Sequence, residues 1–203
     1  MTIQVTPTDA SCGARITGVD LHKAISASDL EAIRRAWVKH RVVIFPDQFL
    51  DDDGLERFTV EMGGFGEDPF FDPIEGRKNI AAILREADEK SPLFAENWHS
   101  DWSFLENPPA GTCLAAVEIP PMGGDTLFAD QIASFSALPE ERKSYLRSLT
   151  AIHSARGAYA PDGTYGDSDE DDRSMAITPD ESANETRHHP LIRKHPETGE
   201  EGI

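Results

Sequence analysis

A histidine and a carboxylate stand two residues apart in the run NWHSDW at residues 97–102. On an extended strand, side chains at positions i and i+2 leave the same face, so His99 and Asp101 are expected to point together. An imidazole and a carboxylate on one face supply two ligands of the 2-His-1-carboxylate triad, which binds non-heme Fe(II) and leaves coordination positions open. These residues therefore predict a metal site, and an ordinary solvated strand surface is the alternative.

A second histidine is needed to complete such a triad. Four histidines outside the run are candidates, and none has a distinctive context: His153, His188, His189 and His195. His153 falls on a predicted strand. The favoured interpretation is that it belongs to the core or contacts a metal ligand without binding the metal itself. Each is a weak candidate, so the third ligand stays unassigned.

A hydroxyl follows a glycine turn in the run GGDT at residues 123–126. Thr126 could donate a hydrogen bond to a carboxylate, or it could satisfy the backbone of the turn. The residues alone favour the turn.

The chain has 203 residues and a formal net charge of −18. This length fits one domain with a real core. The negative charge disfavours binding to nucleic acid and to anionic membranes. An anionic substrate would then need specific arginine, lysine or hydroxyl groups to hold it against the overall potential.

Two cysteines, Cys12 and Cys113, lie far apart and form no metal-binding or redox pair. They are interpreted as reduced thiols, which favours the cytoplasm. The N-terminus shows no signal-peptide pattern, and no apolar stretch approaches the about 20 residues that a membrane helix needs.

Hydrophobic periodicity predicts many short strands and a few helices. A capping box at Ser28 and Glu31 predicts a helix over 28–40, and acids at 51–53 predict the start of another. Apolar helical spacing predicts a third over 139–149. Strands are expected over 3–5, 15–19, 41–45, 79–84, 98–104, 112–119, 126–129 and 150–155. The pattern is typical of a β-sandwich or barrel that carries outer helices.

Residues 162–187 are rich in acidic, small and turn-forming residues and poor in large apolar ones. Such a segment buries too little surface to offset its ordering entropy. It is expected to be a mobile loop within a single domain of residues 1–203.

Taken together, the motifs resemble the taurine dioxygenase / 2,4-dichlorophenoxyacetate dioxygenase (TauD/TfdA-like) family of Fe(II)/2-oxoglutarate-dependent oxygenases. The family's metal-binding strand, its Pro-Pro turn and its glycine-aspartate-threonine segment are similar to NWHSDWSFLENPPAGTCLAAVEIPPMGGDTLFAD. Three further segments resemble the family in the same order: GARITGVDL, HRVVIFPDQFLDDDGLERF and HHPLIRKHPETGEEGI. The resemblance covers almost the whole chain.

The resemblance implies a double-stranded β-helix, or jelly roll, with Fe(II) at its open end. It makes His99 and Asp101 the first two ligands, and Thr126 a hydrogen-bond donor to 2-oxoglutarate. The second ligand histidine and the arginine for 2-oxoglutarate would come from later strands. The chain is therefore expected to be an N-terminal portion of a family member, incomplete at the C-terminus.

The implied reaction couples O2 and the decarboxylation of 2-oxoglutarate to hydroxylation of a small organic, anionic substrate, in some members with cleavage of a carbon–heteroatom bond. The substrate would contact the region near residue 70 and the segment before His99. The expected contacts are Phe70, Ala95, Asn97 and Phe104. Phe70 and Ala95 make the pocket less polar than taurine needs.

Two other interpretations stay open. The chain could be a catalytically inactive fragment or a non-catalytic jelly-roll binding module, because missing strands would expose sheet edges that aggregate or pair in a homo-oligomer. It could also be a cupin-like metal enzyme that completes its site with His153 or His189 and does not use 2-oxoglutarate.

Overall fold

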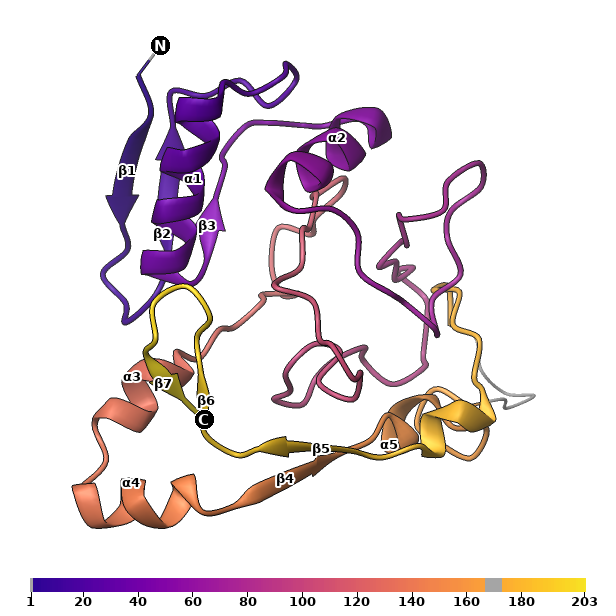
Figure 1. The fold of residues 1–203 in the computed structure, drawn as a ribbon. Coiled ribbons are helices and arrows are strands. Elements are labelled where there is room, and N and C mark those ends of the chain that lie inside the picture. Colours follow the sequence, from indigo (N-terminus) through magenta and orange to yellow (C-terminus); the bar gives the residue numbers. More distant parts are fainter. Residues whose placement is uncertain (1, 167–172) are drawn as a thin grey trace. The chain divides into compact units, whose positions relative to one another are not determined.

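The computed structural model describes residues 2–166 and 173–203, and Figure 1 shows their helices and strands in chain order. The chain forms two compact units. The first unit consists of Met1–Gly64, Cys113–Thr150 and Pro190–Ile203, and the second consists of Phe65–Thr112 and Ala151–His189. The single domain expected over residues 1–203 stays a prediction.

A three-stranded sheet opens the first unit. Strand β1 (Gln4–Pro7) pairs antiparallel with β2 (Ala14–Thr17), and β2 pairs parallel with the short strand β3 (Val43–Ile44). All three strands fall where the sequence predicts them, although β3 is shorter than the expected strand over 41–45. The parallel pairing is possible because a helix connects β2 to β3.

That connecting helix, α1 (Ala27–His40), begins after the N-cap residue Ser26. The Ser26 hydroxyl accepts a hydrogen bond from the Asp29 backbone N–H at 3.1 Å. The predicted capping box at Ser28 and Glu31 is therefore wrong. The helix starts earlier because the Ser26 side chain already satisfies one of its unpaired N–H groups.

The next helix, α2 (Asp52–Met62), confirms the prediction from its acidic start. The Asp51 side chain caps it by accepting from the Gly54 N–H at 2.8 Å. The helix ends at Gly63, whose φ of +144° is accessible to glycine but strained for other residues.

The core of the first unit lies between α1 and the sheet, and Figure 1 shows α1 lying along the strands. Ile16 of β2 and Ile33 of α1 are both 0% exposed. Val43 and Phe45 add partly buried apolar surface to the same cluster. Burial of these side chains is the main favourable contribution to this packing.

The rest of the first unit contains two short helices and a hairpin. The unpredicted helix α3 spans Gln131–Ser136, and α4 (Glu140–Arg147) falls within the predicted helix over 139–149. Strands β6 (Arg193–Lys194) and β7 (Glu201–Gly202) pair antiparallel. Side-chain ion pairs attach the hairpin to other parts of the same unit: Arg34 to Glu197, Arg41 to Glu200 and Arg147 to Glu201.

A two-stranded sheet leads into and out of the second unit. Strand β4 (Thr150–His153) pairs with β5 (Arg187–Pro190), and β4 lies within the predicted strand over 150–155. Between them come the short helix α5 (Arg156–Tyr159) and the 3-10 helix η1 (Glu181–Asn184).

Aromatic rings form the centre of the second unit. Phe70 is 3% exposed and stacks on Tyr159, with 4.7 Å between ring centroids and 10° between ring planes. Phe104 lies 5.7 Å from Phe70 by the same measure. Ala155, Ala160 and Ala183 complete the buried cluster.

The acidic segment over 162–187 is described only in part, because residues 167–172 lie outside the described residues. Its described part buries Met175 and Ala183 to 5% and 1% exposure. Ile177 also forms a β-bridge with Phe71. These residues are packed inside the second unit, so the described part of the segment makes more buried contacts than its low apolar content predicts. Its mobility stays a prediction.

Four predicted strands are wrong, because no strand is assigned over 79–84, 98–104, 112–119 or 126–129. A strand exists only where its N–H and C=O groups pair with a neighbour, and the described residues provide none beside these segments. Leu114, Val117 and Ile119 are accordingly exposed.

Helices occupy more of the described chain than strands, and the strands form three separate small sheets. The expected mainly β architecture is therefore not seen in this part of the chain. No described helix combines the length and apolar character needed to cross a membrane. Cys12 and Cys113 are free thiols, as expected.

Candidate metal centre

The His99 and Asp101 side chains lie together in the second unit. Nε2 of His99 is 3.1 Å from Oδ1 of Asp101, and the side chains are 50% and 46% exposed. Two ligands that bind one ion at about 2.1 Å and at right angles lie about 3 Å apart. The pair therefore has the separation that adjacent ligands of one octahedral ion require.

Neighbouring groups orient both side chains. Nδ1 of His99 lies 2.8 Å from the Asn97 carbonyl oxygen, which only accepts, so Nδ1 donates there and Nε2 is the ring nitrogen that faces Asp101. The Thr112 hydroxyl donates to Oδ2 of Asp101 at 2.7 Å, which leaves Oδ1 on the side of the imidazole. Hydrogen bonds of this kind hold metal ligands in place.

The backbone that carries the pair is a turn and not the predicted strand. Trp102 has a φ of +47°, and its carbonyl accepts from the Leu105 N–H at 2.9 Å. Trp98, which precedes His99, is 70% exposed.

A second exposed pair of the same type provides an internal comparison. Nδ1 of His22 lies 3.2 Å from Oδ1 of Asp20, in the first unit. The Lys23 ammonium lies 2.6 Å from Oδ2 of Asp20 and is the main cause of the fall in the Asp20 pKa to about 2. A cation therefore already neutralises Asp20, whereas the neutral Thr112 hydroxyl leaves the charge of Asp101 uncompensated.

The described residues contain no cluster of three or more potential metal ligands. His153 and His189, the candidates of the cupin-like interpretation, contact other groups. Nδ1 of His153 lies 3.0 Å from the Ser103 hydroxyl, and Nε2 of His189 lies 3.2 Å from the Leu105 carbonyl. The structure therefore gives that interpretation no support, and His99 and Asp101 fit two of the three triad positions.

The predicted substrate-contacting residues occupy different environments within the second unit. Phe70 and Phe104 belong to its aromatic core. Ala95 has a φ of +55°, and its N–H donates to the Tyr165 hydroxyl at 2.9 Å. Asn97 uses its backbone carbonyl to orient His99.

Tyr159, next to Phe70, is the most strongly perturbed group of this aromatic core. Burial raises the pKa of its phenol well above the ordinary value of 10.0, and the charges of Asp68 and Asp101 add to the shift. Tyr159 is therefore a neutral phenol at physiological pH.

Thr126 belongs to the first unit and lies in an exposed segment without assigned helix or strand. Its predicted hydrogen bond to 2-oxoglutarate stays a prediction.

Sequence reasoning missed the groups that orient the site. Thr112, which bonds Asp101, was treated only as a residue of the predicted strand over 112–119. Ser103 and Leu105, which contact the two histidines, follow Asp101 closely but carry no motif. For Ser103 and Leu105, the available signal was that they lie close to His99 and Asp101 along the chain. The sequence offered no such signal for Thr112.

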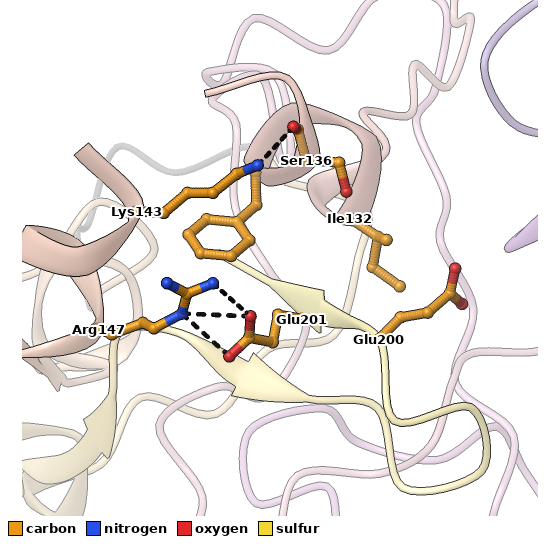
Figure 2. A pocket seen from close by; sticks show the side chains of 7 residues that line it. Ile132, Ser136, Lys143, Arg147, Glu200 and Glu201 are labelled. Carbon is orange, nitrogen blue, oxygen red and sulfur yellow. Dashed lines mark hydrogen bonds and ion pairs between the residues drawn. The ribbon is translucent and has the colours of Figure 1, made fainter. Parts of the chain in front are cut away.

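The first unit contains a separate cavity of about 180 Å³ (Figure 2). Its lining residues are Ile132, Phe135, Ser136, Lys143, Arg147, Glu200 and Glu201. Arg147 donates to Glu201 and to Glu140, and Lys143 donates to the Ser136 carbonyl at 2.8 Å. The lining residues come from α3, α4 and the β6–β7 hairpin, and none of them is a predicted site residue.

Comparison with known proteins connects this chain to one family. The profile of the taurine catabolism dioxygenase TauD, TfdA family matches residues 4–203. The chain is 31% identical to an alpha-ketoglutarate-dependent sulfate ester dioxygenase from Pseudomonas putida, over 99% of this chain and 65% of the relative. It is 29% identical to an (S)-phenoxypropionate/alpha-ketoglutarate-dioxygenase from Delftia acidovorans, over 98% of this chain and 69% of the relative.

The structure is similar to that of a taurine dioxygenase from Burkholderia xenovorans, with a TM-score of 0.64 and 29% identity over 99% of this chain and 62% of that chain. The chain thus spans about two thirds of the length of these proteins. This shared fold and the family match place the chain among proteins related to the taurine dioxygenases. Within this class, the chain belongs to the TauD/TfdA family, whose members use Fe(II), 2-oxoglutarate and O2.

Proposed function

We propose that the protein is an Fe(II)- and 2-oxoglutarate-dependent dioxygenase that hydroxylates a small organic anion. The observation that carries the proposal is the 3.1 Å contact between His99 Nε2 and Asp101 Oδ1, in a chain that belongs to this family. His99 and Asp101 would hold two coordination positions of the iron. When bound, the iron would activate O2, which amino-acid side chains alone cannot do.

The roles of the other residues follow from the family. Thr126 would donate a hydrogen bond to the distal carboxylate of 2-oxoglutarate. In the proposed double-stranded β-helix, the segments over 79–84, 98–104, 112–119 and 126–129 would have strand partners. Their apolar composition and their exposure in this chain support that pairing. Paired strands would also remove the edges that favour a homo-oligomer.

The proposed substrate is an alkyl sulfate ester or an aryloxy acid of small size. The two relatives named above act on a sulfate ester and on phenoxypropionate. Phe104 is partly buried and packs against the buried Phe70 in the second unit, and Ala95 and Asn97 lie on the segment that leads to His99. The apolar character of Phe70, Phe104 and Ala95 favours the organic group of such a substrate over the amine of taurine.

The expected reaction needs no further reductant, because 2-oxoglutarate and the substrate together supply the electrons that reduce O2. A sulfate ester RCH2OSO3⁻, O2 and 2-oxoglutarate give succinate, CO2 and a carbon that bears both hydroxyl and sulfate. Loss of hydrogen sulfate from that carbon then gives the aldehyde. The protein positions the substrate and excludes water from the site.

The function is tested by anaerobic addition of Fe(II) and 2-oxoglutarate, followed by O2 and a panel of alkyl sulfates, alkyl sulfonates and phenoxypropionates. A visible charge-transfer band and succinate formation that depends on one of these substrates are expected. His22→Ala should leave both unchanged, and His99→Ala should abolish both. Iron binding without a band would contradict the use of 2-oxoglutarate, and failure to bind iron would favour the inactive fragment or binding module.

Free Cys12 and Cys113 support the cytoplasm, a reducing compartment, as the proposed location.

A further inference from the structure

We propose that His153 and His189 are positioning residues that hold the turn carrying the metal-binding pair, an inference that rests on the proposed function. His153 lies on β4 and His189 on β5, which pair with each other. Their ring centroids are 5.4 Å apart. Both rings contact residues that follow Asp101 by two and four positions, namely Ser103 and Leu105.

The turn needs such support because its own backbone supplies little. Residues 97–105 form no helix or strand, and Trp102 has a positive φ of 47°. The Leu105 N–H closes the turn on the Trp102 carbonyl at 2.9 Å. A non-glycine residue in this region is strained and persists only when surrounding contacts determine it. The histidine contacts at Ser103 and Leu105 fall on either side of Phe104, which is packed in the aromatic core.

The chemistry of the two contacts assigns separate nitrogens. A carbonyl oxygen only accepts, so Nε2 of His189 must carry a proton and donate to Leu105 at 3.2 Å. A protonated ring nitrogen cannot bind a metal ion, so this contact excludes Nε2 of His189 as a ligand. His153 uses Nδ1 toward the Ser103 hydroxyl at 3.0 Å. Each ring therefore directs one nitrogen at the turn that carries the metal-binding pair.

The use of different nitrogens makes the proposal testable by side-chain replacement. The asparagine amide nitrogen occupies roughly the place of Nδ1, and the glutamine amide nitrogen occupies roughly the place of Nε2. His153→Asn and His189→Gln should preserve the contacts. The swapped replacements, His153→Gln and His189→Asn, should lose them.

The experiment measures Mn(II) binding to the full chain by electron paramagnetic resonance, with circular dichroism to confirm folding. His153→Ala and His189→Ala are expected to raise the dissociation constant for Mn(II) about tenfold, the lower end for residues that support ligands. His153→Asn and His189→Gln should restore binding close to the wild type. Hydrogen exchange of residues 98–106 should accelerate in the alanine variants and return to normal in the restored ones.

The outcomes separate the two proposals. If the wild-type chain binds no Mn(II), the proposed function fails. If the wild-type chain binds Mn(II) and the alanine variants bind it equally well, the positioning role is overturned. It is also overturned if the swapped variants His153→Gln and His189→Asn bind Mn(II) as well as His153→Asn and His189→Gln do. Ser103→Ala removes the His153 contact while both histidines stay in place, so it covers the case in which an alanine variant does not fold. Its binding should match that expected for His153→Ala, and unchanged binding would overturn the proposal.

Discussion

Replacement of Thr112 by valine should weaken metal binding while the shape of the turn is kept. The Thr112 hydroxyl donates to Oδ2 of Asp101 at 2.7 Å, the length of a charge-assisted bond. Such bonds to charged groups contribute about 1.5–3 kcal/mol. Because the Asp101 side chain is 46% exposed, water can replace part of the bond, so we expect the lower end, about 1.5 kcal/mol. This corresponds to about a tenfold rise in the dissociation constant.

The assay is titration of the full chain with Mn(II), followed by electron paramagnetic resonance of the free ion. Thr112→Ser is the matched control, because serine keeps the hydroxyl and should bind Mn(II) nearly as the wild type does. Thermal unfolding without metal should show both variants folded. Equal affinities for Thr112→Val and the wild type would refute the assigned role of the hydroxyl, and so would equal losses in the valine and serine variants.

Three further predictions concern the first unit. Ile33→Ala should lower the free energy of unfolding by about 2–5 kcal/mol and Ile33→Val by only about 0.5–1.5 kcal/mol; equal losses in urea titrations would contradict complete burial of Ile33. Ser26→Ala should cost about 1 kcal/mol through loss of the α1 cap, whereas Ser28→Ala should stay within about 0.5 kcal/mol; the reverse order would restore the predicted capping box. The hydrogen bond from Arg147 lowers the pKa of Glu201 below its ordinary value of 4.5 in the folded protein. The contribution of Glu201 to stability is therefore complete above pH 4.5, and it is lost as the pH falls through the lower pKa of the folded state. Glu201→Gln should therefore be less stable than the wild type at pH 7 and equally stable in strong acid; a difference that is independent of pH would refute the ion pair.

Local signals predicted the elements of residues 2–62 well. The acidic start of α2 and the apolar spacing of α1 act within a few residues, and both helices form where expected. The position of the α1 cap was missed by two residues because Ser26 and Ser28 are both suitable caps. Only the hydrogen bond to the Asp29 N–H decides between them.

Predicted strands failed where pairing depends on distant segments. Residues 112–119 have the composition of a strand, yet composition cannot supply the neighbour that a strand needs. The His99–Asp101 pair shows the opposite case. The strand from which its geometry was inferred is absent, and the two side chains still meet because Thr112 and the Asn97 carbonyl orient them. Residue types indicated the chemistry, whereas long-range contacts decide the geometry.

Mn(II) binding by the chain and by its His99→Ala and Asp101→Ala variants tests the central claim most directly. The account predicts that the wild type binds one ion, that either substitution removes this binding, and that His22→Ala leaves it unchanged although His22 also sits beside an aspartate. Wild-type affinity in the His99→Ala or Asp101→Ala variant would contradict the account.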